Sequence, residues 1–199
     1  MQKNTQKGFT LIELLLVLAI IAGIGVAAFM IYPRVQAGNS ATNNASALNA
    51  AAAQIQALFP SARYANLSQN VACKGDVFPD SFKDDTTCAV ATMKNEWDGA
   101  VSIGPAGITG ATATGNAARY YYIHYANVPS KVCAKLAPAL ASNFGIVGIG
   151  AVAGVAPTAA QTVVNTFDAV ATNDVPNEAN VANGCQTASG RATITVVGR

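Results

Sequence analysis

Charged side chains and histidine are scarce in this sequence. Of its 199 residues, 12 are Lys or Arg and 10 are Asp or Glu, so 11% are charged, against about 25% in typical soluble proteins. The net charge of +2 excludes a strongly basic surface for nucleic acid. The single histidine, His124, has no closely spaced His/Cys partners for a metal, and no glycine-rich phosphate loop is present. So little charge also disfavours a freely diffusing cytosolic enzyme.

Apolar residues make up 51% of the chain and gather in one run. Phe9 to Tyr32 holds 24 residues, of which 20 are apolar. As a helix this run would be about 36 Å long, enough to cross a bilayer core of about 30 Å. Lys3 and Lys7 precede the run, and positive flanks stay in the cytoplasm. We therefore expect one membrane segment with a cytoplasmic amino terminus, followed by one exported domain.

The apolar run contains one acidic residue, Glu13. The run is longer than the apolar region of a cleaved secretory signal, which spans about 7–15 residues. It could be a plain membrane anchor, but a carboxyl group inside a membrane helix costs about 2.5–3.5 kcal/mol and marks a functional site. No Lys, Arg or His lies within the run. The partner of Glu13 must therefore come from another chain or from a newly created amino terminus.

The segment KGFTLIE, from Lys7 to Glu13, resembles the class III signal of type IV pilins and pseudopilins. The resemblance implies that a prepilin peptidase cleaves after Gly8 and that Phe9, the new amino terminus, is N-methylated. It also implies that Glu13 meets the Phe9 amine of a neighbouring subunit during assembly. Two parallel helices shifted by about one turn would bring these groups together. A mis-registered subunit would leave both charges unpaired, so the pair would specify register.

The same resemblance divides the chain into three parts. Residues 1–8 would be a leader, residues 9–33 a transmembrane helix that becomes the filament core, and residues 34–199 an exported head that includes the second half of the long helix. The implied fold class is α+β, with this helix packed on an antiparallel β-sheet. The precursor would lie in the inner membrane and the mature subunit in an extracellular filament.

The sequence pattern extends the first helix from Phe9 to about Phe59, where Pro60 ends it. Pro33 is expected to break or kink this helix, and with Gly23 and Gly25 it brackets a weakened stretch. In the family such a stretch often melts when subunits pack, and a simple kink at the membrane exit is the alternative. Apolar residues at helical spacing predict a face that lies on a sheet: Ala41, Ala45, Leu48, Ala52, Ile55 and Phe59.

The rest of the chain is expected to form the head. We expect strands at residues 100–103, 119–125 and 191–197. We expect helices at residues 129–140, with Ser130 as N-cap, and at residues 158–169. Residues 61–97 have no sustained period and predict an irregular loop. Residues 144–155, apolar and glycine-rich, predict a buried strand or a subunit contact.

Four cysteines follow the membrane segment, which in an exported domain implies two disulfides with three possible connectivities. They do not form the closely spaced CxxC pairs that are typical of zinc sites. We favour Cys73–Cys88, which closes a short loop, together with Cys133–Cys185. The pilin resemblance supports the second pair, because a carboxy-terminal disulfide delimits the D-region of that family.

The head carries a narrower resemblance, to type IVb pilins of the PilS-like thin-pilus group. It rests on QIQALFPSARY, NEWDGAVSI, VPSKVCAKL and the end of the chain from Cys185 to Thr195. The eight-residue leader and the Phe after it look more like type IVa. The resemblance implies a major pilin that polymerises with copies of itself and needs no cofactor. It would serve adhesion, aggregation or conjugation at a host or recipient-cell surface, after handling by the prepilin peptidase, an assembly ATPase and an inner-membrane platform protein.

Two other classes compete with this interpretation: a type II secretion pseudopilin or minor pilin, and a membrane-anchored periplasmic enzyme. His124 lies among tyrosines on an expected strand, which favours a packed or surface residue over a catalytic one. The acidic pairs Asp84–Asp85 and Glu96–Asp98 read as solvated turns. The last acids, Asp168, Asp174 and Glu178, lack a calcium-loop pattern. We therefore assign no catalytic residue and no metal site.

Overall fold

The computed structural model describes residues 10–85, 87–88, 92–107, 118–150, 162–167 and 175–199. Its contacts divide the chain into two compact units, Met1–Gly38 and Asn39–Arg199. The first unit holds the beginning of one long helix. The second unit, here called the head, holds the rest of that helix together with a β-sheet and, among its described residues, three further α-helices. The expected α+β class is confirmed.

Helix α1 (Leu11–Leu58) is 48 residues long. The expected single long helix is present, and it continues without a break through Gly23, Gly25 and Pro33, so of the two effects expected of Pro33 a break does not occur and a kink stays a prediction. One missing hydrogen-bond donor weakens a helix locally, but the turns on either side keep their own hydrogen bonds. The end is close to the prediction, since the Phe59 amide still donates to the Ile55 carbonyl at 3.0 Å before the chain turns.

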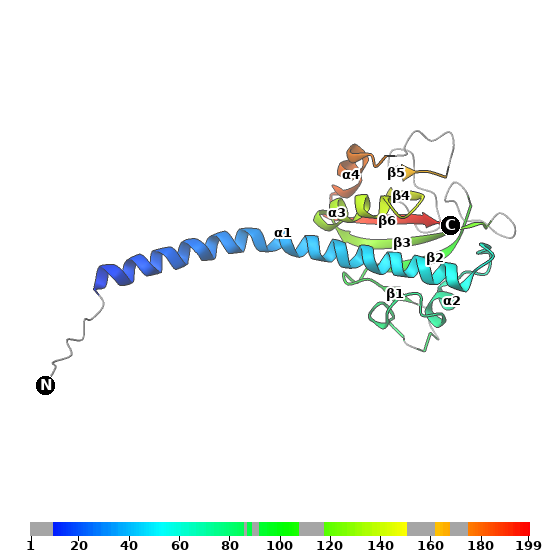
Figure 1. Cartoon of the computed structure of the whole chain (residues 1–199), viewed down its shortest axis with the longest axis horizontal. Helices are drawn as coiled ribbons and strands as arrows, with labels where there is room; N and C mark the ends of the chain where they lie inside the picture. The colour runs from blue at the N-terminus through cyan, green and yellow to red at the C-terminus, as the bar shows by residue number, and fades with distance from the viewer. Residues whose placement is uncertain (1–9, 86, 89–91, 108–117, 151–161, 168–174) are drawn as a thin grey trace. The chain divides into compact units, whose positions relative to one another are not determined.

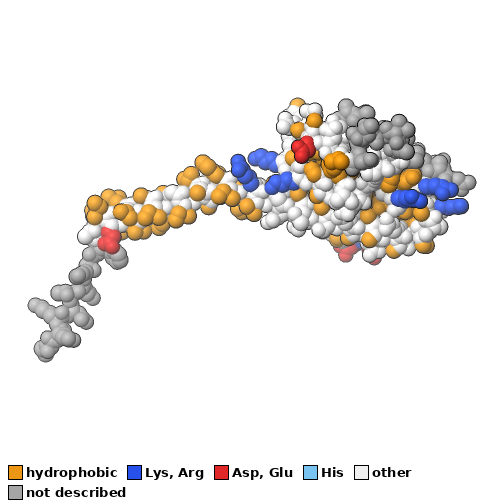
Figure 2. Space-filling view, turned by 45° about the horizontal axis from the view of Figure 1, so that its top comes forward, with side chains coloured by type: hydrophobic (Ala, Val, Ile, Leu, Met, Phe, Trp, Pro, Cys, Tyr) orange, Lys and Arg blue, Asp and Glu red, His pale blue; other side chains and the backbone are white. Residues whose placement is uncertain are grey.

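In the first unit the apolar side chains of α1 are exposed to solvent. Every described residue from 10 to 36 is exposed, and the large apolar ones from Leu11 to Val35 are all among them. Figure 2 shows these hydrophobic side chains along the helix, with an acidic group near its beginning. A helix that is apolar all round is stable only in a membrane or packed among other chains. In the described part of the chain, α1 alone is long and apolar enough to span a membrane.

The head contains a six-stranded sheet of order β1-β2-β3-β6-β4-β5, in which every neighbouring pair is antiparallel. Its strands are β1 (Met93–Lys94), β2 (Ala100–Ala106), β3 (Tyr120–Pro129), β4 (Ile146–Ile149), β5 (Thr162–Asn165) and β6 (Arg191–Gly198). The last strand lies between β3 and β4, with Val196 opposite both Ile123 and Val147. The three predicted strands are confirmed as β2, β3 and β6, and a buried strand within residues 144–155 is confirmed as β4.

The short helices of the head lie in two places. Helices α3 (Ser130–Ala141) and α4 (Glu178–Cys185) contact each other and strands β4, β5 and β6. Helix α2 (Gln69–Lys74) contacts β2, and a 3₁₀ turn, η1 (Asp80–Phe82), follows it. In Figure 1, α3 and α4 lie on one side of the carboxy-terminal half of α1, and β1 and α2 lie on the other.

Three expectations for the head need correction. Residues 162–165 form the edge strand β5 and not a helix, in keeping with the β-branched Thr-Val-Val sequence, and residues 158–161 and 168–169 lie outside the described residues. Residues 61–97 are not wholly irregular, because they hold α2, η1 and β1. The N-cap of α3 is Pro129, so Ser130 is its first helical residue, and the buried Ser130 hydroxyl has no hydrogen-bond partner among the described residues.

The core of the head lies between α1 and the sheet. The predicted apolar face is confirmed for most of its positions, but Ala51 is fully buried where Ala52 was expected, and Phe59 is half-buried. Tyrosines provide much of the opposing surface, and the rings of Tyr64 and Tyr121 meet edge to face with centroids 5.1 Å apart. Leu48 is 1% exposed within this core, whereas Leu58 on the same helix is 42% exposed.

Leu48→Ala should lower the free energy of unfolding of the head by about 2–5 kcal/mol, because it leaves a cavity under α1. Urea unfolding of the full chain in detergent, followed by tryptophan fluorescence, measures the change. Leu58→Ala, the same substitution on the same helix, should change stability far less. Equal losses in both variants would contradict the packing of α1 on the sheet.

Candidate functional site: the assembly helix and the disulfide-bonded head

Glu13 lies in the first turn of α1, where the Thr10 carbonyl accepts from the amides of Glu13 and Leu14 at 3.1 and 3.2 Å. A carboxylate there is favoured by the positive end of the helix dipole. Its side chain is exposed, and the described part of the first unit holds one other charged residue, Arg34. Gly8 and Phe9 lie outside the described residues, so cleavage, methylation and the pairing of Glu13 with an amine stay predictions.

Among the described residues, none packs against Gly23 or Gly25. A Cβ added at either position would meet no atom within 4 Å. In a helix interior each glycine costs about 0.5–1 kcal/mol relative to alanine. Small residues on membrane helices let a second helix approach closely. The arrangement therefore suits contacts with another helix, which a single chain does not supply.

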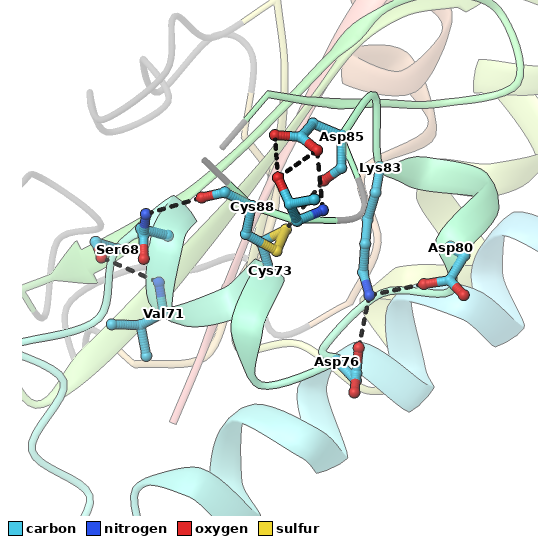
Figure 3. The surroundings of a disulfide bond; sticks show 10 residues. Ser68, Val71, Cys73, Asp76, Asp80, Lys83, Asp85 and Cys88 are labelled. Carbon is cyan, nitrogen blue, oxygen red and sulfur yellow. Dashed lines mark hydrogen bonds and ion pairs between the residues drawn. A yellow bond between two sulfur atoms is a disulfide. The ribbon is translucent and has the colours of Figure 1, made fainter. Parts of the chain in front are cut away.

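Cys73 and Cys88 form the first disulfide, which joins α2 to the loop after η1. Figure 3 shows the segment that it closes, with the Lys83 side chain reaching from the loop toward Asp76 and Asp80. The Lys83 ammonium lies 2.5 Å from an Asp76 carboxylate oxygen and 2.8 Å from one of Asp80. These hydrogen bonds raise the pKa of Lys83 above its ordinary value. The Cys73–Cys88 disulfide and the Lys83 ammonium, which Asp76 and Asp80 share, thus hold together a segment that is mostly loop.

The second disulfide, Cys133–Cys185, joins α3 to α4 across 52 residues of sequence. Both cysteines are buried. The Asn177 side chain caps α4 by accepting from the Asn180 amide at 3.1 Å, and the Asn180 side chain donates to the Thr162 carbonyl at 2.6 Å. These contacts tie the end of the chain to the edge strand β5. Both disulfides have the pairing favoured from the sequence.

A polar cluster of two buried side chains, Asn44 and Tyr125, and the exposed Glu96 joins α1 to the sheet. The Tyr125 hydroxyl on β3 donates to the Asn44 side-chain oxygen on α1. The Asn44 amide group donates in turn to the Ser40 carbonyl at 2.8 Å and to a Glu96 carboxylate oxygen at 3.0 Å. Burial, with a smaller effect of the Glu96 charge, raises the pKa of Tyr125. Sequence reasoning missed Asn44, because it is one of three polar residues between Ala41 and Ala45 and no pattern in the sequence distinguishes it from Thr42 and Asn43.

The predicted solvated turn at Glu96–Asp98 is held firmly to β3. The Asn95 side chain donates to the Ala126 carbonyl at 2.6 Å, and the Asn127 side chain donates to the Trp97 carbonyl at 2.7 Å. Gly99 lies so close to the backbone of β3 that a Cβ added to it would be 2.0 Å from the Ala126 carbonyl oxygen. Glycine is therefore required at position 99, and the turn presents Glu96 to Asn44.

His124 is buried in the sheet, with Nδ1 3.0 Å from the Thr195 hydroxyl on β6. Burial lowers its pKa. It is a packed residue, as expected from the sequence. Within the described ranges no group of three or more His, Cys, Asp or Glu side chains could hold a metal ion. Asp168 and Asp174, two of the acids considered for calcium, lie outside those ranges.

A long amino-terminal helix packed on a six-stranded antiparallel sheet, with a disulfide joining the carboxy-terminal segment to α3, is the fold of a pilin. The structure resembles crystalline TcpA, a type IV pilin from Vibrio cholerae El Tor, with a TM-score of 0.54 over 81% of this chain and 99% of that one. The two sequences are 14% identical, so this likeness concerns the fold.

Sequence comparisons give the family. The family described as PilS N terminal matches residues 38–198, and the prokaryotic N-terminal methylation motif matches residues 3–29. The chain belongs to the PilS family of type IVb pilins, which are structural proteins and not enzymes. It is 27% identical over 138 residues to the major structural subunit of the bundle-forming pilus of Escherichia coli O127:H6, and equally to that of Escherichia coli O111:H-. The match spans 69% of this chain and 66% of these relatives.

Asn44→Ala should destabilise the head by about 1–3 kcal/mol, because it leaves the buried Tyr125 hydroxyl without its acceptor. Urea unfolding is again the measurement, and Trp97 is a suitable probe because its ring lies 6.2 Å from that of Tyr125. Asn43→Ala, at the exposed neighbouring position, is the matched control and should be close to neutral. If the two variants were equally stable, the polar cluster would not hold the helix.

Proposed function

We propose that this chain is the precursor of the major subunit of a type IV pilus. The observation that carries the proposal is the first half of α1, whose apolar surface is exposed on all sides and includes a single carboxylate. Such a surface needs a membrane before assembly and a bundle of like helices after it. The methylation motif over residues 3–29 and the family match support the same function.

In this proposal a prepilin peptidase removes residues 1–8, cutting after Gly8. Residues 9–33 hold the precursor in the inner membrane, and residues 34–199 form the exported head. Phe9 then carries a methylated amino group. Its charge pairs with the Glu13 carboxylate of the next subunit, which gives each buried charge one partner and sets the axial shift between subunits. An assembly ATPase and a platform protein extract subunits into the filament.

Gly23, Gly25 and Pro33 mark where α1 would adapt in the filament. The helix is continuous there in the single chain. Two glycines and a proline each lower helix stability, so this stretch is the part of α1 that costs least to bend or unwind when subunits pack. The head would form the outer surface of the pilus and meet host or recipient cells in adhesion, aggregation or conjugation.

Glu13→Val should leave cleavage intact but reduce surface fibres strongly, because the Phe9 amine loses its partner inside the bundle. Gly8→Ala should block cleavage itself, so the two variants separate processing from assembly. Mass spectrometry of sheared fibres and of membrane fractions measures both, and wild-type fibres should begin with N-methyl-Phe9. Abundant normal fibres from Glu13→Val would remove the register role. If wild-type fibres did not contain this chain, the proposed function would be contradicted. If the chain were only a small fraction of the fibre protein, the minor-pilin alternative would be favoured.

A further inference from the structure

Three arginines lie close together where α1 ends. Arg63 follows the helix, and Arg119 directly precedes β3. The Tyr64 amide donates to the Ala118 carbonyl at 2.9 Å, so the two arginines next to these groups are neighbours in space although 56 positions separate them in the sequence. Both arginines are exposed.

Arg199 reaches the same place from the end of β6. Gly198, which precedes it, pairs with Tyr121 on β3, two residues after Arg119. The Arg199 carbonyl accepts from the Gln56 side chain of α1 at 2.7 Å, and Arg199 is exposed. In Figure 1 the end of α1 and the carboxyl terminus lie at the same end of the head. We call these three residues the arginine patch: Arg63, Arg119 and Arg199.

The segments that build the arginine patch hold no acidic side chain. The sequence has no Asp or Glu in residues 14–75, 99–167 and 179–199, which include α1 after Glu13 and the strands β2, β3 and β6. Within the described residues the three arginines make no ion pair. Figure 2 shows Lys and Arg side chains gathered at the right-hand end of the head, with no acidic side chain beside them on this face.

Local structural roles account for little of this charge. The carboxyl end of a helix carries about half a negative charge, whereas the patch carries +3, or +2 with the carboxylate at the end of the chain. The acid nearest to Arg63 along the chain, Asp76, is paired with Lys83 at 2.5 Å, and the exposed Lys74 precedes it. Most of the positive charge of the patch is therefore left for a molecule outside the chain.

We propose that the arginine patch binds an anionic polysaccharide through its carboxylate or sulfate groups. The planar guanidinium group presents its donors in a fork that fits such groups with two parallel hydrogen bonds. Single-stranded nucleic acid fits less well, because its bases need exposed rings, and Tyr64 and Tyr121 beside the patch are each 1% exposed. A membrane also fits less well, because Leu58 is the one exposed large apolar side chain in the described residues 39–70.

Repetition of the arginine patch would strengthen this binding. In the filament each subunit would contribute one patch, and a polysaccharide repeats its charges along its length. Many weak contacts add up to tight binding when their spacing lets several form at once. This step rests on the proposed function, whereas binding by a single chain does not. The proposed function leaves the partner of the head open, and the arginine patch specifies its chemistry.

The single chain tests the site first. The full chain in a neutral detergent should bind heparin, a polysaccharide with carboxylate and sulfate groups, and this binding should weaken as salt is raised. Arg63→Gln with Arg119→Gln should weaken it by about tenfold, because two of the three guanidinium groups are lost. Glutamine keeps a polar side chain, and the backbone hydrogen bond between Tyr64 and Ala118 stays. Circular dichroism and intact disulfides check the fold.

Lys131→Gln with Arg191→Gln is the matched control, because it makes the same change of charge at the other end of β3 and β6. Arg191 pairs with Pro129, the last residue of β3, and both cations are exposed. Lys131 lines the groove between α3 and α4 together with the exposed Glu178, which offsets its charge. This variant should lose far less heparin binding. An equal loss in the two variants, or a wild-type chain that does not bind heparin at physiological salt, would overturn the proposed site.

Duplex DNA and vesicles of phosphatidylglycerol distinguish a polysaccharide from other polyanions. If either bound the single chain more tightly than heparin, and the Arg63→Gln, Arg119→Gln variant lost that binding, the polysaccharide would be the wrong partner. Sheared wild-type fibres should bind heparin about tenfold or more tighter than the single chain. Fibres that contain the chain without this gain would overturn the repeated contact. Fibres that lack the chain would overturn the proposed function and leave the result for the single chain standing.

Discussion

The exposed apolar surface of α1 is the constraint on which the rest of the molecule depends. From Leu11 to Val35 the large apolar side chains face outward. Burial of such surface contributes about 25 cal/mol per Å², so this helix cannot remain bare in water. A membrane and then a bundle of identical helices are two successive ways to cover it. In the proposed function the helix serves two environments with one sequence, and Glu13 is the group that would distinguish them.

The head binds the second half of the same helix and leaves the apolar first half exposed. Leu48, Ala51 and Ile55 supply the apolar contact, and the cluster of Asn44, Tyr125 and Glu96 fixes its register. A buried polar group is costly unless it is satisfied, so one register is favoured over those shifted by a turn. The two disulfides act elsewhere, each on a segment that the sheet alone would hold weakly.

Much of this could be predicted from the sequence, because the signals are local or strongly periodic. The run from Phe9 to Tyr32, the tyrosine-rich strand β3 and the terminal strand β6 are of this kind. Residues 162–165 were predicted wrongly, because four residues are too few to show a period and only pairing with β4 makes them a strand. Pro33 was expected to break or kink the long helix, and it does not break it, because a single proline does not outweigh the hydrogen bonds of 48 residues.

By itself the sequence determined the apolar segment, its one acidic residue, the two lysines that precede it, and the number of cysteines, because these depend only on residues close together in the chain. Only the tertiary structure decided that Asn44 meets Tyr125, that the Lys83 ammonium contacts both Asp76 and Asp80, and that the last strand β6 lies between β3 and β4. These arrangements join residues far apart in sequence. Their geometry depends on how the strands pair and on which side chains the fold leaves at the surface.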